Sequence, residues 1–342
     1  MPSNNTMTEG YIDLSLATND IERLVLVFAK YGGQIGNCIF VVCSAWFLAN
    51  NDKIRTNKIL NLISDSFALS LLGLVLFSLI GVKLSTKEVV KQFFPLLFRN
   101  NWFLVCYLCY YMIHPMLNWT IGKLSKLQLF ETCLALIVIY SILASLIEGA
   151  FYSNALISFC MIHFCVAFIK KYMQNLQTNI KINITLLVLC FAGLIFLVLL
   201  TNSLGMRFPA FSNKVTSWCS FRNPMIIIIS ISAFNLVRTI KIESKAINAL
   251  AKLSLPIYLI HANYIMQVYG IGIIFYGVLN ITGSEVLSWL SSGLILLTYG
   301  ILGAVLYHST LQKIIYRIDY RIGDICHDKL NYIMGKITHF IN

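Results

Sequence analysis

Long apolar runs separated by short polar connections dominate the pattern of this 342-residue chain. A helix needs roughly 20 mostly apolar residues to cross a bilayer core about 30 Å thick. Runs near that length predict about nine helices, at residues 34–50, 60–81, 101–117, 128–147, 155–170, 184–203, 223–240, 253–279 and 286–308. The eighth run is long enough to tilt or break. The sequence therefore predicts an all-α fold, a polytopic transmembrane helix bundle of about nine spans.

The basic residues predict how this bundle is oriented. Loops rich in Lys and Arg resist translocation and stay in the cytoplasm. Every second connection is strongly basic, and seventeen of the 26 Lys and Arg residues lie in that set, at 53–58, 123–126, 170–181, 238–252 and 313–336. This asymmetry predicts that the N-terminus lies outside and the C-terminus in the cytoplasm.

Three segments follow from this arrangement: a polar outer N-terminal segment (1–31), the transmembrane bundle (32–310) and a basic amphipathic cytoplasmic tail (311–342). Residues 1–20 lack the basic region and apolar core of a signal peptide, yet they must cross the membrane. Either an upstream helix carries them across, or they are translocated as an ordinary short tail. In the tail, apolar and basic residues alternate at helical spacing, which is typical of a helix on the cytoplasmic leaflet.

Composition excludes several classes of function. Hydrophobic residues make up 58% of the chain and charged residues 12%, against roughly 25% charged in soluble domains. The net charge of +12 does not indicate nucleic-acid binding, because the cations lie at the ends of apolar runs without interleaved aromatics. The ten cysteines are scattered and typical of small buried hydrophobes. Cys106 and Cys109 form a CxxC without a second pair, so no metal site is expected.

His261 is the strongest candidate for chemistry inside the bundle. An ionisable group in a membrane span is costly and is a functional candidate by default. The segment SLPIYLIHANYIMQ places Pro256 five residues upstream, where we expect it to open the helix, with Ser254, Tyr258 and Asn263 as polar partners. An imidazole titrates near neutrality and can move a proton. The alternative is a structural histidine hydrogen-bonded to a neighbouring helix.

A second candidate is a polar stripe on the third predicted span. Tyr107, Tyr111, His114 and Asn118 recur at three- and four-residue spacing and so share one helix face. Trp102, at the start of this span, is typical of an interface anchor. Inside a membrane such a stripe indicates the wall of a pocket, or else a structural hydrogen-bond seam.

The first cytoplasmic loop clusters the cations Lys53, Arg55 and Lys58. They are explained by topology alone, or they form a phosphate clamp for a nucleotide-bearing donor. Glu148, at the outer end of the fourth span, and His163, inside the fifth, are weaker candidates.

Four segments resemble, in order, motifs of the membrane acyltransferase-3 family, in the branch that acts on bacterial surface polysaccharides. GGQIGNCIFVVCSAWFL (32–48) is similar to its Gly-rich stretch and Phe-x-x-x-Ser-Gly-Tyr-Phe-Leu helix. FFPLLFRNNWFLVCYLCYYMIHPMLN (93–118) resembles its Trp-Phe, Tyr and Pro-x-Leu-Asn helix, and residues 223–236 and 247–265 resemble its last third. The resemblance covers residues 32–320, and IYLIH is its most specific motif.

This resemblance implies an O-acyltransferase of the bacterial inner membrane. Its acyl donor is expected to be cytoplasmic acetyl-CoA, and its acceptor a hydroxyl of a cell-surface polysaccharide, such as an O-antigen, or of its lipid-linked precursor. Membrane lipids are the other expected partners, and no metal is expected. The expected residues are His261 and His114 for catalysis, Trp102, Tyr107, Tyr111, Asn118, Ser44 and Tyr258 for substrate, and Arg55 and Lys58 for acyl-CoA.

The chain also departs from the family pattern. The family's usual essential histidine lies in a first helix, some ten residues after an Arg or Lys, and this chain has no such helix or histidine. Both this departure and the outer N-terminus predict that a first helix is missing. The family's Ser-Gly-Tyr-Phe-Leu is replaced by Ser44-Ala45-Trp46-Phe47-Leu48, and His114 stands where a small polar residue is usual.

Two alternatives to an active acyltransferase remain open. The chain could be a truncated or inactive member of that family, since the usual histidine is absent. It could also be a transporter or flippase of lipid-linked glycans, but that class favours internal repeats and paired broken helices. Neither feature is present in the sequence.

The predicted topology is directly testable. A reporter fused after Asn342 should be active in the cytoplasm, and one inserted near Asn5 should be active outside, because the basic loops fix the bundle in that orientation. Paired enzyme reporters that are active on opposite sides of the membrane measure this. A cytoplasmic reading near Asn5 would contradict the nine-span arrangement.

Overall fold

The computed structural model describes residues 20–98, 101–147, 152, 154–208, 218, 220–240 and 244–323. Across these ranges the chain forms helices and no strand. The described residues divide into two compact units. Unit 1 comprises those within Arg55–Val105 and Ser244–Asn342, and unit 2 those within Ile12–Ile54 and Cys106–Glu243.

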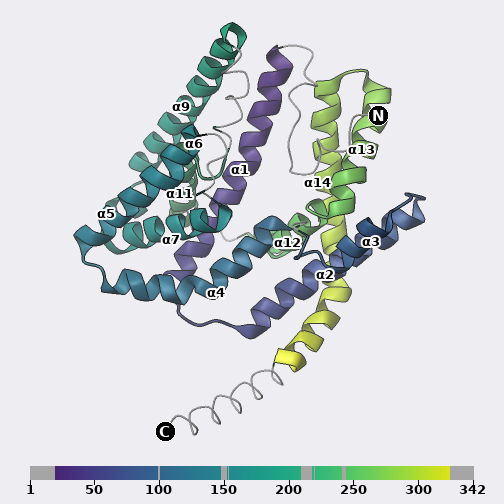
Figure 1. Cartoon of the computed structure of the whole chain (residues 1–342), viewed down its shortest axis with the longest axis horizontal. Coiled ribbons are helices and arrows are strands. Elements are labelled where there is room, and N and C mark those ends of the chain that lie inside the picture. The colour runs from purple at the N-terminus through teal and green to yellow at the C-terminus, as the bar shows by residue number, and fades with distance from the viewer. Residues whose placement is uncertain are drawn as a thin grey trace. The chain divides into compact units, whose positions relative to one another are not determined.

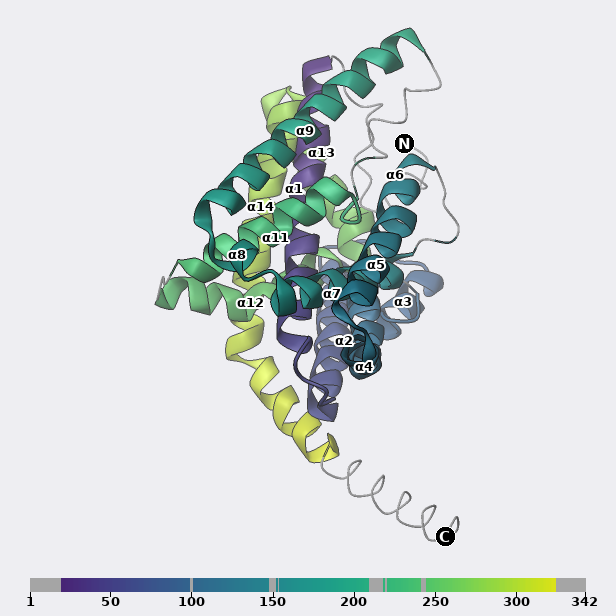
Figure 2. The same ribbon diagram turned by 90° about the vertical axis from the view of Figure 1, so that its left-hand side faces the viewer.

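Unit 2 is built around α1 (Asp20–Leu48), which packs against α7 (Ala155–Tyr172) and α11 (Pro224–Thr239). Helix α11 also packs along α9 (Ile180–Arg207), as Figure 2 shows. The unit also contains α8 (Gln174–Thr178), α5 (Lys126–Ile137), its continuation through η2 (Val138–Leu143) and α6 (Ala144–Leu146), and most of α4 (Trp102–Lys123). Asparagine side chains cap the starts of three of these helices: Asn154, Asn179 and Asn223.

Unit 1 contains α12 (Lys245–His261), which packs against α2 (Thr56–Leu79) and α14 (Glu285–Ser309). Helix α13 (Ile271–Thr282) runs beside α14 (Figure 1) and ends at Gly283, whose φ of 64° favours glycine. The short helix α3 (Thr86–Phe93) packs on α2 and begins with a Ser85–Glu88 capping box. After α14 the chain is again helical over 311–323, while the rest of the predicted tail lies outside the described residues.

Every one of the predicted apolar runs coincides with a helix or, for the eighth, with a broken pair of helices. Among the described residues, six helices are long and apolar enough to cross a membrane, or seven if the bent pair forms one span. Helix α11, with 16 residues, is shorter than these, and α4 is not among them. The described helices therefore fit a multi-pass membrane protein, while the count of nine and the orientation stay predictions.

The eighth run is broken, as expected, but not where Pro256 predicts. Helix α12 continues through Pro256 to His261, so the expected opening at the proline is wrong. The two halves meet at 72°, with the break at residues 262–263. There the Asn263 side chain accepts a hydrogen bond from the Ile265 backbone N–H at 2.9 Å and starts the next helix. An N-capping asparagine satisfies free backbone donors at the start of a new helix, whereas a proline removes only one backbone donor from a helix that can continue.

Asn263 is held from both sides. Its Nδ2 donates to Gln92 Oε1 at 3.2 Å, and the same oxygen accepts the Ser70 hydroxyl at 2.7 Å. Gly73 of α2 lies against this amide, since a Cβ there would be 2.6 Å from Asn263 Nδ2. The missing side chain of Gly73 is what lets α2 pack against the bend.

Gly73→Ala should therefore destabilise unit 1. The new methyl would collide with an amide fixed by its own hydrogen bonds, and overpacking of this kind costs about 1–3 kcal/mol. The matched control is Gly293→Ala in α14, where an added Cβ meets no atom within 4 Å. Thermal unfolding of the purified protein in detergent should show a lower midpoint for the first variant only. Equal midpoints would show that the Asn263 side chain can move away from the new methyl group without lowering the stability.

Candidate functional site

A chain of hydrogen bonds joins Tyr110, His163 and Asn118 in unit 2. The Tyr110 hydroxyl lies 2.6 Å from His163 Nδ1, and His163 Nε2 lies 2.9 Å from Asn118 Oδ1. The Asn118 amide nitrogen donates to Leu48 O at 2.9 Å and to Asp52 Oδ1 at 2.8 Å. Tyr110 and His163 are fully buried. The chain of bonds thus leads from the interior of α4 and α7 to the loop that follows α1.

Asp52 fixes the polarity of this hydrogen-bond chain. A carboxylate only accepts, so the Asn118 nitrogen must face it and the Asn118 oxygen must face His163. His163 then donates from Nε2, and its Nδ1 accepts the Tyr110 hydroxyl proton. The imidazole is therefore satisfied as a neutral ring of one defined tautomer.

His114 ties α4 to the same loop. Its Nδ1 lies 2.5 Å from Tyr111 O and its Nε2 lies 2.7 Å from Asn51 O. Its ring stacks on Tyr111, with centroids 5.2 Å apart, and Tyr111 stacks on Tyr107 at 6.2 Å. The predicted stripe is thus a buried column of rings ending at His114 and Asn118, and its role as a pocket wall stays a prediction.

Two cations meet at Trp46, near the end of α1. Lys170 Nζ donates to Trp46 O at 2.7 Å and lies 5.1 Å from the ring centroid. Arg238 lies over the same ring at 4.2 Å and donates to Gln177 O at 2.9 Å. Cation–π contact lets Trp46 hold both cations without a carboxylate. This pair of cations lies at the same end of α1 as the Leu48 carbonyl that Asn118 contacts.

His261, at the end of α12 in unit 1, is held by two carbonyl oxygens. Its Nδ1 lies 2.6 Å from Ile257 O and its Nε2 lies 2.8 Å from Leu296 O of α14. None of the three polar side chains expected as its partners bonds the ring: Ser254, for instance, donates to Ala251 O instead. Gly300 makes room for the ring, since a Cβ there would lie 2.9 Å from Nε2. To act as a base, His261 must first break its contact with one of these two carbonyl oxygens, so that one ring nitrogen can accept a proton.

The remaining predicted site residues fall into separate places. In unit 1, Trp102 and Tyr258 both pack on Phe103, with ring centroids 5.5 and 5.7 Å away. Arg55 and Lys58 are exposed at the start of α2. In unit 2, Ser44 is half-buried on α1. Glu148 lies outside the described residues.

A buried carboxylate in unit 1, Asp65, is not among the site residues predicted from the sequence, and with Tyr307, Gln312 and Tyr316 it forms what we call the Asp65 cluster. Asp65, inside α2, is fully buried and accepts hydrogen bonds from Tyr307 at 2.7 Å and Tyr316 at 2.8 Å. The Gln312 amide nitrogen also donates to both carboxylate oxygens, at 3.1 and 3.3 Å. A carboxylate within an apolar run is itself a functional signal, and it would have found this residue.

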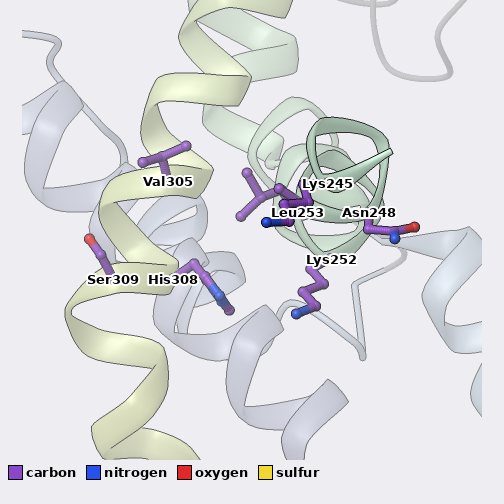
Figure 3. A pocket seen from close by; sticks show the side chains of 8 residues that line it. Lys245, Asn248, Lys252, Leu253, Val305, His308 and Ser309 are labelled. Carbon is purple, nitrogen blue, oxygen red and sulfur yellow. The ribbon is translucent and has the colours of Figure 1, made fainter. Parts of the chain in front are cut away.

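A cavity of about 470 Å³ opens between the start of α12 and the end of α14 (Figure 3). Lys245, Lys252 and His308 line it together with the apolar Leu253 and Val305. None of the predicted site residues lies in it. Among the described residues, no group of three His, Cys, Asp or Glu is placed to hold a metal ion.

A family model described as an acyltransferase domain matches residues 8–309. No curated protein and no solved structure matches the chain. The match covers both units and every predicted site residue.

Asn118 should fasten the 49–52 loop to α4. In Asn118→Asp a carboxylate replaces the amide that donates to Leu48 O and Asp52, and in Asn118→Ala the bonds are simply lost. Leaving such groups unpaired costs about 1–3 kcal/mol, which raises the open fraction of the loop roughly 5- to 150-fold. Trypsin cleavage at Lys53 should accelerate accordingly, and more in the Asp variant.

Thr120→Val is the control, because Thr120 bonds only Met116 O of its own helix. Cleavage at the control rate in both Asn118 variants would show that this amide does not hold the loop.

Proposed function

Since the chain belongs to the acyltransferase-3 family, and is therefore a membrane-bound acyltransferase, we propose that it moves an acetyl group from cytoplasmic acetyl-CoA to a hydroxyl of a cell-surface polysaccharide or its lipid-linked precursor. The observation that carries this proposal is the family match over most of the chain. The resemblance of residues 32–48 and 93–118 to the polysaccharide branch narrows the acceptor. We place the protein in a bacterial inner membrane for the same reason.

Acetyl transfer to a hydroxyl needs a base and a stabilised leaving group. A base takes the proton of the sugar hydroxyl, the oxygen bonds the thioester carbonyl carbon, the C–S bond breaks, and the CoA thiolate receives the proton. We assign the base to His261, with His114 as the second candidate. His261 would exchange its 2.8 Å contact with Leu296 O for the acceptor hydroxyl.

The binding roles follow from side-chain chemistry. Arg55 and Lys58 are exposed cations suited to the phosphates of acetyl-CoA. The rings of Trp102, Tyr107, Tyr111 and Tyr258, with Ser44 and Asn118, would contact the sugar. No feature of the described residues favours a transporter: one helix pair is broken, whereas that class pairs such breaks across two halves.

The test is acetyl transfer by the purified chain in liposomes, with radiolabelled acetyl-CoA and a glycan fraction from the source membrane. We expect transfer by the wild type. His261→Ala and His261→Gln should each lower it by about 10²- to 10⁴-fold, the usual contribution of a general base. Both variants should insert normally, as measured by size-exclusion profiles in detergent.

The two substitutions separate catalysis from structure. Glutamine can still donate to Leu296 O, so transfer retained in His261→Gln but lost in His261→Ala would assign the residue to the α12–α14 contact only. No transfer by the wild type, with transfer restored by adding a histidine-bearing first helix, would favour the inactive-member alternative.

A further inference from the structure

The cavity between α12 and α14 in unit 1 is lined by residues that have no role in the proposed acyl transfer. Lys245 and Lys252 lie seven residues apart, so both project from one face of α12. His308 reaches in from the last turn of α14, and Figure 3 shows Lys252 and His308 pointing toward one another across the opening. Leu253 and Val305 form an apolar part of the same wall.

The charges in this cavity are uncompensated. No acidic residue lines it. Within the part of the chain that the structure describes, neither Lys245 nor Lys252 forms a hydrogen bond, ion pair or ring contact, and both side chains are exposed. Two ammonium groups at one opening repel each other, and a bound anion would relieve that repulsion. The lysines therefore give this opening the charge to attract a negatively charged ligand.

His308 is oriented toward that ligand by the Asp65 cluster. The Gln312 amide nitrogen donates to the Asp65 carboxylate and to Tyr316 Oη at 2.9 Å, so its oxygen must point the other way. That oxygen lies 2.6 Å from His308 Nδ1, which therefore carries a proton. The other nitrogen, Nε2, has no partner among the described residues. Nε2 is therefore the ring nitrogen that is left for a ligand.

We propose that this cavity binds a phosphate group carried on an amphiphilic molecule. The lysines act as compact charges for the phosphate oxygens, as Lys does in many phosphate sites. His308 adds a directed hydrogen bond, and Leu253 with Val305 contacts the carbon chain next to the phosphate. In the predicted orientation this end of α12 faces the cytoplasm. Two sources carry such a group there: an anionic glycerophospholipid and coenzyme A.

Binding tests this without relying on acyl transfer. The full chain is placed in phosphatidylcholine nanodiscs, with or without phosphatidylglycerol. Native mass spectrometry then counts retained phosphatidylglycerol, and calorimetry measures the Kd for CoA. The variants are Lys245→Gln/Lys252→Gln and His308→Gln. The control is Lys313→Gln/Arg317→Gln, which removes two exposed cations beyond the end of α14.

We expect the lysine variant to weaken binding of one probe by about 30-fold, since each cation near a phosphate contributes about 1 kcal/mol. His308→Gln should weaken the same probe, and the control should not. Loss of phosphatidylglycerol alone identifies a lipid site, and loss of CoA alone identifies a coenzyme site. Unchanged binding of both probes, or equal loss in the control, would overturn the proposal. If the double variant misfolds, the single variant Lys252→Gln gives the same comparison, because this side chain is exposed and its replacement should not disturb folding.

Discussion

A hydrocarbon environment offers no water, so a polar side chain within these helices is stabilised when another part of the chain supplies its hydrogen bonds. Asp65 is the extreme case, because its buried carboxylate takes hydrogen bonds from Tyr307, Gln312 and Tyr316. In unit 2, Asn118 plays the corresponding role by joining α4, α7 and the loop after α1. A few such contacts determine how the helices of each unit pack, since apolar surfaces alone favour many alignments.

The same constraint decides what each histidine can do. An amide beside a carboxylate has one favourable orientation, with its nitrogen toward the carboxylate. Its oxygen then faces the histidine, and the ring nitrogen that contacts this oxygen must carry a proton. At His163 both ring nitrogens are then used inside the protein. At His308, which lines the cavity, the contact with Gln312 uses only Nδ1. The first arrangement suits a structural link, and the second suits recognition of a ligand.

His114 and His261 form a third kind, with each ring nitrogen close to a carbonyl oxygen. A neutral imidazole has one donor, so it can satisfy only one of its two carbonyl contacts at a time. Such a ring links two elements through its contacts with both carbonyls. A catalytic role for either residue therefore requires that substrate binding exchange a carbonyl for the acceptor hydroxyl.

The sequence by itself determined the helices, because apolar run length and capping residues act locally. It also predicted that Tyr107, Tyr111 and His114 share one helix face and that the eighth run can break, while the role of His261 stays a prediction. It misplaced that break at Pro256, since the capping geometry of Asn263 depends on contacts with Gln92 and on the space left by Gly73. Tertiary packing alone brought Asp65 to Tyr307, and Lys252 to His308. Residues so distant in sequence meet only when whole helices pack together. The local pattern of apolar and polar residues does not determine which helix faces will be in contact.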